Sequence, residues 1–344
     1  MRARLESVLT RCWMHRGWVA WLLLPLAVVF RFMTWVHRAW YALGLATTRR
    51  APVPLIVVGN VVAGGLGKTP VVMALVQHLK QRGLTVGIVS RGHGRHGDMP
   101  QLVVDASRAD DVGDEPLLLA RRCATPVAVA RQRMDAVHLL LQAHPDVQVI
   151  VSDDGLQHHA MRHDVAVCVF DDRGIGNGWP LPAGPLREAW PRQPRYDSVQ
   201  FVLNTGTTPA LEGYQATRQL ALEVRNGFGE SRQLSHWVDK PIAAMAGIAH
   251  PERFFEMLQR QGLTIASSLA LADHADTASL EQAWQQLRAH QDIFCTEKDA
   301  VKLWPRHAQV WAVALLTELP PELLARIDDV LASKLSSPHG HQTA

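Results

Sequence analysis

The chain has 344 residues, a length that suits two domains with ample room for a core. Its formal net charge is only +3, which argues against a protein that binds nucleic acid over a broad basic surface. The four cysteines are scattered without the spacing of a metal site, and each lies in an apolar context. We therefore expect reduced cysteines in a cytosolic compartment rather than a disulfide framework.

The first fifty residues differ from the rest because they hold five of the eleven tryptophans. An uninterrupted apolar run covers residues 18–30, which is shorter than the roughly 20 residues that span a bilayer. Arginines lie on both sides of this run, and no small-residue cleavage site follows it. The pattern predicts a helix inserted in the cytoplasmic face of a membrane. A tryptophan-rich helix packed on the globular core is the alternative.

A glycine-rich segment follows an apolar strand pattern at residues 55–58 and precedes a helical pattern at 69–82. The segment consists of Gly64, Gly65, Leu66, Gly67, Lys68 and Thr69. Strand, glycine turn and helix in this order are typical of a phosphate-binding P-loop, in which backbone N–H groups and the helix N-terminus meet an anion. Lys68 would reach the β- and γ-phosphates of a nucleotide, and the Thr69 hydroxyl would lie on Mg²⁺. Val62 replaces a glycine of the usual pattern, so the loop is a Gly-Gly-x-Gly-Lys-Thr variant.

Strands and helices alternate through the first half of the chain. We predict strands at 55–58, 86–90, 102–104, 127–130, 147–151, 165–170 and 199–203, and helices at 69–82, 116–122, 131–143 and for a turn or two after Glu188. Strands rich in Val and Ile and separated by helices predict an α/β fold of P-loop NTPase type, with a mostly parallel sheet covered by helices on both faces. A proline-rich stretch at 180–194 is expected to be an ordered loop.

A second αβ series begins beyond residue 237 and predicts a smaller domain with its own sheet. Its expected strands are 242–247, 265–270 and 293–296, and its expected helices are 251–261 and 278–289. The predicted organisation is a membrane-associating helical segment at 1–45, a P-loop core at 46–199, a connecting segment at 200–239, a smaller α/β domain at 240–332 and a disordered tail at 333–344.

Three clusters of charged residues lie between predicted elements. Asp153 and Asp154 end an apolar strand, where an acid of a P-loop enzyme coordinates Mg²⁺; a solvated Asp-Asp-Gly turn is the alternative. Asp114 and the acid after it precede a helix, and the residues alone leave N-capping and catalysis equally open. Arg187 and Glu188 end a rigid proline-containing turn. The patterns thus indicate a site at the carboxyl edge of the sheet.

Seven blocks in order make the chain resemble the tetraacyldisaccharide 4′-kinase family over nearly its whole length. They are Val-Gly-Asn-x-x-x-Gly-Gly-x-Gly-Lys-Thr-Pro (58–70), Ser-Arg-Gly-x-Gly-Arg (90–95), Gly-Asp-Glu-Pro (113–116), Asp-Asp-Gly-Leu-Gln-His (153–158), Gly-Asn-Gly (176–178), Leu-Pro-Ala-Gly-Pro-Leu-Arg-Glu (181–188) and Thr-Glu-Lys-Asp-Ala-Val-Lys (296–302). The resemblance implies an enzyme on the cytoplasmic face of the bacterial inner membrane. Its implied reaction moves the γ-phosphoryl group of ATP, with Mg²⁺, to the 4′-hydroxyl of an acylated glucosamine disaccharide 1-phosphate and gives lipid IVA.

The resemblance also implies roles for individual residues. Asp114 would be the base that takes the 4′-hydroxyl proton, and His274 would pair with it. The residues implied around the metal are Thr69, Asp154 and Glu188, with Asp153 and Gln157 in support, and those implied to steady phosphates are Arg133 and Arg187. His93 stands where the family commonly has tyrosine, and the sequence assigns it no role.

Two other classes of protein fit parts of the pattern. A membrane-associated P-loop switch or partitioning ATPase acting through protein partners would use the same loop, but it commonly carries a lysine at the position of Ala63. A kinase or ligase for a soluble small molecule would leave the apolar N-terminal segment without a reason. We infer the lipid substrate and the membrane surface as partners, and no obligate protein partner.

Overall fold

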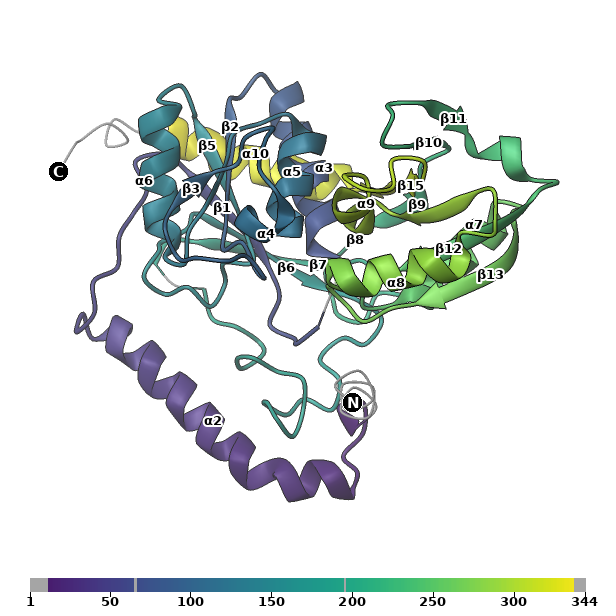
Figure 1. Cartoon of the computed structure of the whole chain (residues 1–344). Helices are drawn as coiled ribbons and strands as arrows, with labels where there is room; N and C mark the ends of the chain where they lie inside the picture. The colour runs from purple at the N-terminus through teal and green to yellow at the C-terminus, as the bar shows by residue number, and fades with distance from the viewer. Residues whose placement is uncertain (1–11, 65–66, 195, 337–344) are drawn as a thin grey trace.

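The computed structural model describes residues 12–64, 67–194 and 196–336 of the chain. In this part, the strands form an eight-stranded sheet, a six-stranded sheet and a two-stranded ribbon. The two large sheets lie side by side, and one long helix stands away from both (Figure 1).

The eight-stranded sheet has the order β3-β4-β2-β5-β1-β6-β7-β8. Its strands are β1 (Leu55–Gly59), β2 (Val86–Ser90), β3 (Gln101–Leu102), β4 (Val127–Val129), β5 (Val149–Asp153), β6 (Val165–Phe170), β7 (Val199–Asn204) and β8 (Tyr214–Gln215). All neighbours are parallel except β3 and β4. Strands β1, β2, β5 and β6 are buried along their whole length, which is why they have continuous apolar sequences. The mostly parallel P-loop-type sheet predicted from the sequence is confirmed.

Three helices that belong to this sheet match the predicted ones within a few residues: α3 (Lys68–Gln81), α5 (Asp114–Cys123) and α6 (Arg133–Ala143). The short helix α4 (Ala109–Val112) was not predicted. The helix predicted after Glu188 is wrong, because residues 189–194 are irregular. Pro191 and Pro194 lack the N–H that a helix needs and disfavour helical backbone at the residue before them. The segment is the ordered loop that its prolines predict, and it pairs with the P-loop strand through a bridge between Val62 and Leu186.

The six-stranded sheet has the order β11-β10-β15-β14-β12-β13. Its strands are β10 (Glu223–Arg225), β11 (Ser231–Gln233), β12 (Pro241–Ala246), β13 (Thr264–Ala270), β14 (Ile293–Thr296) and β15 (Trp311–Val313), and its helices are α7 (Pro251–Arg260), α8 (Thr277–Leu287) and α9 (Glu297–Leu303). Alternate residues of β12 face opposite cores: Ile242 and Ala244 pack with the phenylalanines of α7, and Ala243 and Met245 pack with α8 and α9.

The chain crosses between the two sheets more often than the sequence suggests. Residues 200–239, expected as a connecting segment, supply β7 and β8 to one sheet and β10 and β11 to the other. Strand β9 (Thr217–Leu220) pairs with β16 (Leu315–Glu318) between them. After β16 the chain returns as α10 (Pro321–Leu335), which packs into the core of the first sheet. The expected tail at 333–344 therefore begins as helix, and residues 337–344 lie outside the described residues.

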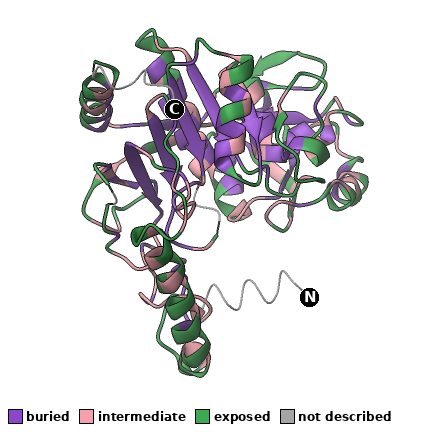
Figure 2. Ribbon diagram, turned by 90° about the vertical axis from the view of Figure 1, so that its left-hand side faces the viewer, coloured by how far each residue is buried: buried purple, intermediate pink, exposed green. Residues whose placement is uncertain are grey.

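Helix α2 (Trp18–Ala42) continues the predicted apolar run by twelve residues and leaves most of its surface exposed (Figure 2). The helix has 25 residues, and an 18-residue window within it has a mean hydropathy of 1.9, so it is long and apolar enough to cross a membrane. Only 11% of that window is buried. Its start is held by an edge contact between Trp21 and Trp179, and its end by a hydrogen bond from Arg38 to the carbonyl of Gln193. The helix is therefore attached to the body at its ends and is not packed on the core.

Candidate active site

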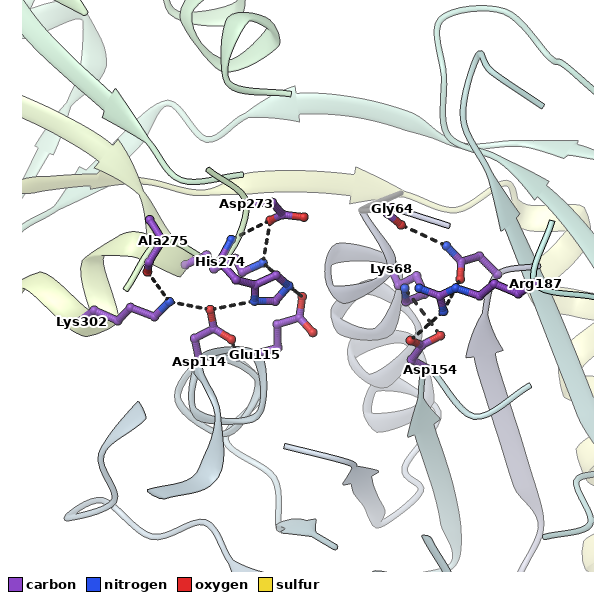
Figure 3. Close-up of polar contacts among 12 residues, drawn as sticks. Gly64, Lys68, Asp114, Glu115, Asp154, Arg187, Asp273, His274, Ala275 and Lys302 are labelled. Carbon is purple, nitrogen blue, oxygen red and sulfur yellow. Dashed lines mark hydrogen bonds and ion pairs between the residues drawn. The ribbon is translucent and has the colours of Figure 1, made fainter. Parts of the chain in front are cut away.

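A cavity of about 1550 Å³ lies between the two sheets. It is larger than the roughly 300–1,000 Å³ of a typical small-molecule pocket, so it has room for a nucleotide and part of a second substrate. Lys68 and Asp154 line one wall, and Glu115, His274 and Lys298 line the other. Figure 3 shows these two groups of polar residues on separate elements.

The phosphate wall begins with the glycine loop that joins β1 to α3. Gly67 has a φ of +68°, a backbone conformation that residues with a Cβ rarely adopt. A Cβ here would also lie 2.3 Å from the guanidinium of Arg218. Lys68 is the first residue of α3, and the side chain of this lysine is 12% exposed. Gly64 and Thr69 are also in place beside the cavity, whereas Gly65 and Leu66 lie outside the described residues. The loop, strand and helix have the predicted order.

Asp153 ends β5 and pairs in register with Val58 of β1, and Asp154 follows it. Asp153 is 1% exposed, so the alternative of a solvated turn is wrong for this acid, whereas the side chain of Asp154 is 34% exposed. Burial, followed by the negative charge of Glu115, raises the pKa of Asp153 above its usual value. Burial also favours the neutral form of Asp154, but its pKa is lowered because Lys68 (3.5 Å) and Arg187 (3.4 Å) stand beside it.

The two predicted phosphate-steadying arginines have different surroundings. Arg187 contacts Asp154 and is held by its loop, whose backbone bonds to the P-loop strand through Arg187 N–H and the carbonyl of Val61 at 2.7 Å. Arg133 is 4% exposed and donates to the backbone carbonyl of Asp154 at 2.8 Å. Burial lowers the pKa of Arg133 to about 10. Arg133 thus fixes the acidic turn, and Arg187 keeps a third of its side chain open to the cavity.

Glu188 is not brought to the cavity lining with the other predicted metal ligands. Its carboxylate accepts a hydrogen bond from Gln157 at 2.8 Å and pairs with Arg192 at 3.4 Å. Gln157 also donates to the carbonyl of Asn60, so Glu188 supports the turn after β1 through Gln157. A metal-ligating role for Glu188 remains a prediction from the family resemblance.

The acids at the end of β5 fit a hard cation such as Mg²⁺. Asp153 Oδ1 is buried and lacks a hydrogen-bond donor among the described residues, and Asp154 Oδ1 makes only the 3.5 Å ion pair with Lys68. Two acceptor oxygens that line one cavity with Thr69 are the donor set that Mg²⁺ takes when phosphates and water complete its shell. The described residues hold no cluster of three His, Cys, Asp or Glu, which a site made of protein ligands alone would need.

The base wall holds the pair Asp114 and His274, of which only His274 is among the residues that line the cavity. Asp114 opens α5, and His274 follows β13 in the other sheet with a φ of +57°. His274 Nδ1 lies 3.2 Å from Asp114 Oδ2. The pairing implied by the resemblance is therefore present in the structure. Gly113 is the helix N-cap residue, and Asp114 Oδ1 instead accepts from the N–H of Glu115 at 2.9 Å.

The protonation of this pair is set by burial and by neighbouring charges. Asp114 is 4% exposed, and burial favours its neutral form, but the His274 hydrogen bond, Lys298 and Lys302 outweigh that effect and hold the pKa of Asp114 well below its usual value. Burial lowers the pKa of His274, whereas Asp114 and Glu115 raise it, and the net shift is upward. Asp114 is therefore ionised at neutral pH.

Two lysines of α9 lie beside this pair, and neither was predicted as a site residue. Lys302 Nζ lies 2.8 Å from Asp114 Oδ2, and Lys298 Nζ lies 3.1 Å from His274 Nε2 and 3.4 Å from Glu115. The two lysines are four residues apart, so they share one face of the helix. That spacing, within the quoted 296–302 block, is the signal that could have found them.

Arg218 is a further residue that the sequence missed. It lies on β9 and donates to the carbonyl of Gly67 at 3.1 Å, so it covers the P-loop. Burial lowers the pKa of Arg218 to about 10. No local pattern marks it, because β9 meets the P-loop only through the tertiary fold.

Comparisons with known proteins agree on one family. The sequence model described as tetraacyldisaccharide-1-P 4′-kinase matches residues 19–332. A tetraacyldisaccharide 4′-kinase of Polaromonas naphthalenivorans is 47% identical over 98% of this chain and 100% of its own length. One of Delftia acidovorans is 48% identical over 94% of each chain. The crystal structure of an "apo" form of LpxK from Aquifex aeolicus in complex with ATP superposes with a TM-score of 0.72 at 23% identity, covering 91% of this chain and 99% of that one, which supports the fold.

Proposed function

The chain belongs to the tetraacyldisaccharide-1-phosphate 4′-kinase family, and from that premise we propose how its residues transfer the γ-phosphoryl group of ATP to the 4′-hydroxyl of the lipid disaccharide. The product is lipid IVA, in lipid A biosynthesis. A P-loop switch acting through protein partners is not favoured by this membership. The observation that carries the assignment is that Lys68 and His274 face one cavity from two different sheets.

The phosphate wall binds the nucleotide. Lys68, the loop N–H groups and the positive end of α3 meet the β- and γ-phosphates, and Arg187 adds a second cation. Phosphoryl transfer mainly requires that the protein stabilise the charge of the phosphate oxygens and align the reacting groups, and these residues do so. Thr69, Asp153 and Asp154 would hold Mg²⁺, which when bound neutralises charge on the phosphate oxygens.

The base wall receives the proton of the sugar hydroxyl. Asp114 accepts it, and His274 holds the carboxylate in one orientation through Nδ1. A carboxylate with a low pKa suffices because the transition state of phosphoryl transfer is loose and places little charge on the attacking oxygen. Lys302 keeps Asp114 ionised until the proton arrives.

Asp114 does not itself line the cavity, because residues of the other sheet cover it. Asp114 belongs to α5 of the first sheet, whereas His274 and Lys302 belong to the second. A small displacement of one sheet against the other would open the carboxylate to the sugar. Closure of the two sheets around the bound sugar would then exclude water and limit ATP hydrolysis.

Helix α2 supports the proposal that the enzyme works on the cytoplasmic face of the inner membrane. Apolar side chains are exposed along its length, including Trp18 at 78%, Leu22 at 70% and Met33 at 64%. An apolar surface of this extent marks a membrane or interaction site. A substrate with four acyl chains stays in the bilayer because each buried CH₂ contributes about 0.8 kcal/mol. The enzyme therefore meets it there.

The membrane role is tested by the variant Leu22→Gln/Leu26→Gln/Val29→Gln, which leaves the Trp21–Trp179 contact intact. We expect weaker binding to anionic vesicles and slower transfer to vesicle-embedded substrate, with ATP affinity unchanged. Leu222→Gln/Phe228→Gln, which changes exposed apolar residues of the second sheet, is the matched control. Normal vesicle binding by the α2 variant would remove this role.

The reaction itself is tested with γ-labelled ATP, Mg²⁺ and the tetraacylated disaccharide 1-phosphate in mixed micelles. The expected product carries label on a second phosphate. If the full-length protein binds ATP but does not form this labelled lipid, the proposed reaction is refuted.

A further inference from the structure

His93 packs against the residue that orients the base. Its ring lies 5.3 Å from the ring of His274, centroid to centroid, with an interplanar angle of 68°. This is the edge-to-face arrangement that aromatic pairs prefer. Both rings line the cavity, and they come from opposite sheets.

The loop that carries His93 is fastened next to Asp114. Gly92 and Gly113 both have positive φ, at +69° and +94°, and pack against each other's backbone. A Cβ on Gly113 would lie 3.1 Å from the carbonyl of His93, so only glycine allows this approach. The backbone N–H of His96 also donates to the carbonyl of Asp110 at 2.7 Å. His93 and Asp114 thus share one frame in the first sheet.

The hydrogen bonds of His274 do not fix the plane of its ring, and the contact with His93 does. Nδ1 is hydrogen-bonded to Asp114 and Nε2 to Lys298, and both bonds allow the ring to tilt. The other charged groups around the pair are Glu115 on α5, Lys302 on α9 and Asp273 beside His274.

We propose that His93 is a positioning residue for the 4′-kinase reaction, which holds the His274 ring against Asp114. The proposal rests on the proposed function of Asp114 and His274.

The kinetic test compares H93A, H93F and the control H96A, which removes an exposed histidine of the same loop. H93A should lower kcat about two- to ten-fold, the size of one aromatic pair contact, and leave the KM for ATP unchanged. H93F should recover most of that loss, because a phenyl ring can make the same edge contact. A normal kcat in H93A, or an H93F variant as slow as H93A, would overturn the proposal.

A double-mutant cycle separates this proposal from the function on which it rests. In the H274A background, H93A should cause no further loss, because the ring it positions is absent. If H274A is slow and H93A adds its full loss to it, the positioning role fails and the base pair stands. If H274A transfers phosphate at the wild-type rate, the proposed role of the base pair has failed instead.

Discussion

The two walls of the cavity are built in different ways. On the phosphate wall, Lys68, Asp154 and Arg187 all project from the carboxyl edge of one sheet. On the base wall, Asp114 belongs to that sheet and His274 to the other, 160 residues further along the chain. Lys298 and Lys302 also come from the second sheet.

The difference separates two tasks of a kinase. Lys68, Asp154 and Arg187 belong to the first sheet, and only Arg218 reaches the P-loop from β9, so we expect this wall to bind a nucleotide with little dependence on the position of the second sheet. The base wall exists only when both sheets meet, so it can act only in the assembled state. A change on the base wall should therefore reduce transfer and leave nucleotide affinity alone, whereas a change on the phosphate wall should reduce both.

Asp114→Asn is the sharpest test of this separation. We expect a loss of transfer of about 10²–10⁴, because the amide cannot accept the hydroxyl proton, with normal ATP affinity. Rates with labelled ATP and equilibrium nucleotide binding measure the two effects. The matched control is Glu115→Gln, which removes the adjacent carboxylate that does line the cavity. A larger loss in Glu115→Gln than in Asp114→Asn would move the base to Glu115.

Lys68→Ala should break the other wall. Loss of this cation from the transferring phosphate should slow transfer by about 10²–10³ and weaken ATP binding as well. The same two assays apply, with Lys80→Ala, at the far end of α3, as the control. Near-normal turnover in Lys68→Ala would contradict the P-loop assignment.

Lys302→Met tests whether the base wall depends on the second sheet. Removing the 2.8 Å contact with Asp114 should lower kcat roughly ten-fold, since a hydrogen bond to a charged group contributes about 1.5–3 kcal/mol. ATP affinity should not change. Lys240→Met, which alters a surface lysine bonded to His236, serves as the control. An unchanged kcat in Lys302→Met would show that Asp114 does not need this partner.

The smallest effect concerns the pH dependence of stability. The pKa of His274 is raised in the folded protein, so its pairing stabilises the fold fully below the unfolded pKa of about 6.5 and loses this effect as pH rises through the folded pKa. The pKa of Asp114 is lowered, so its contribution is constant above about pH 4. The gap in urea midpoint between wild type and His274→Ala should shrink from pH 6 to pH 9. A gap that widens would contradict the raised pKa.

Local patterns predicted much of the fold because the central strands of the first sheet are buried on both faces. Val165–Phe170 is apolar throughout for this reason, and its predicted bounds match the structure. The pattern failed where the environment is mixed. Strands β8 to β11 are short and partly exposed, so they carry no distinct periodicity. The site residues predicted from the loop and acid motifs came together in part for the same reason, since the carboxyl ends of parallel strands share one edge.

The sequence by itself determined the P-loop, the acids that follow β5 and the family to which the chain is similar, because these depend on residues close together in the chain. Only the tertiary structure decided that Lys302 holds Asp114, that Arg218 covers Gly67 and that His93 meets His274. Each of these contacts joins elements of different sheets or of distant strands. Their positions follow from how the sheets pack, and no local pattern of residues records that packing.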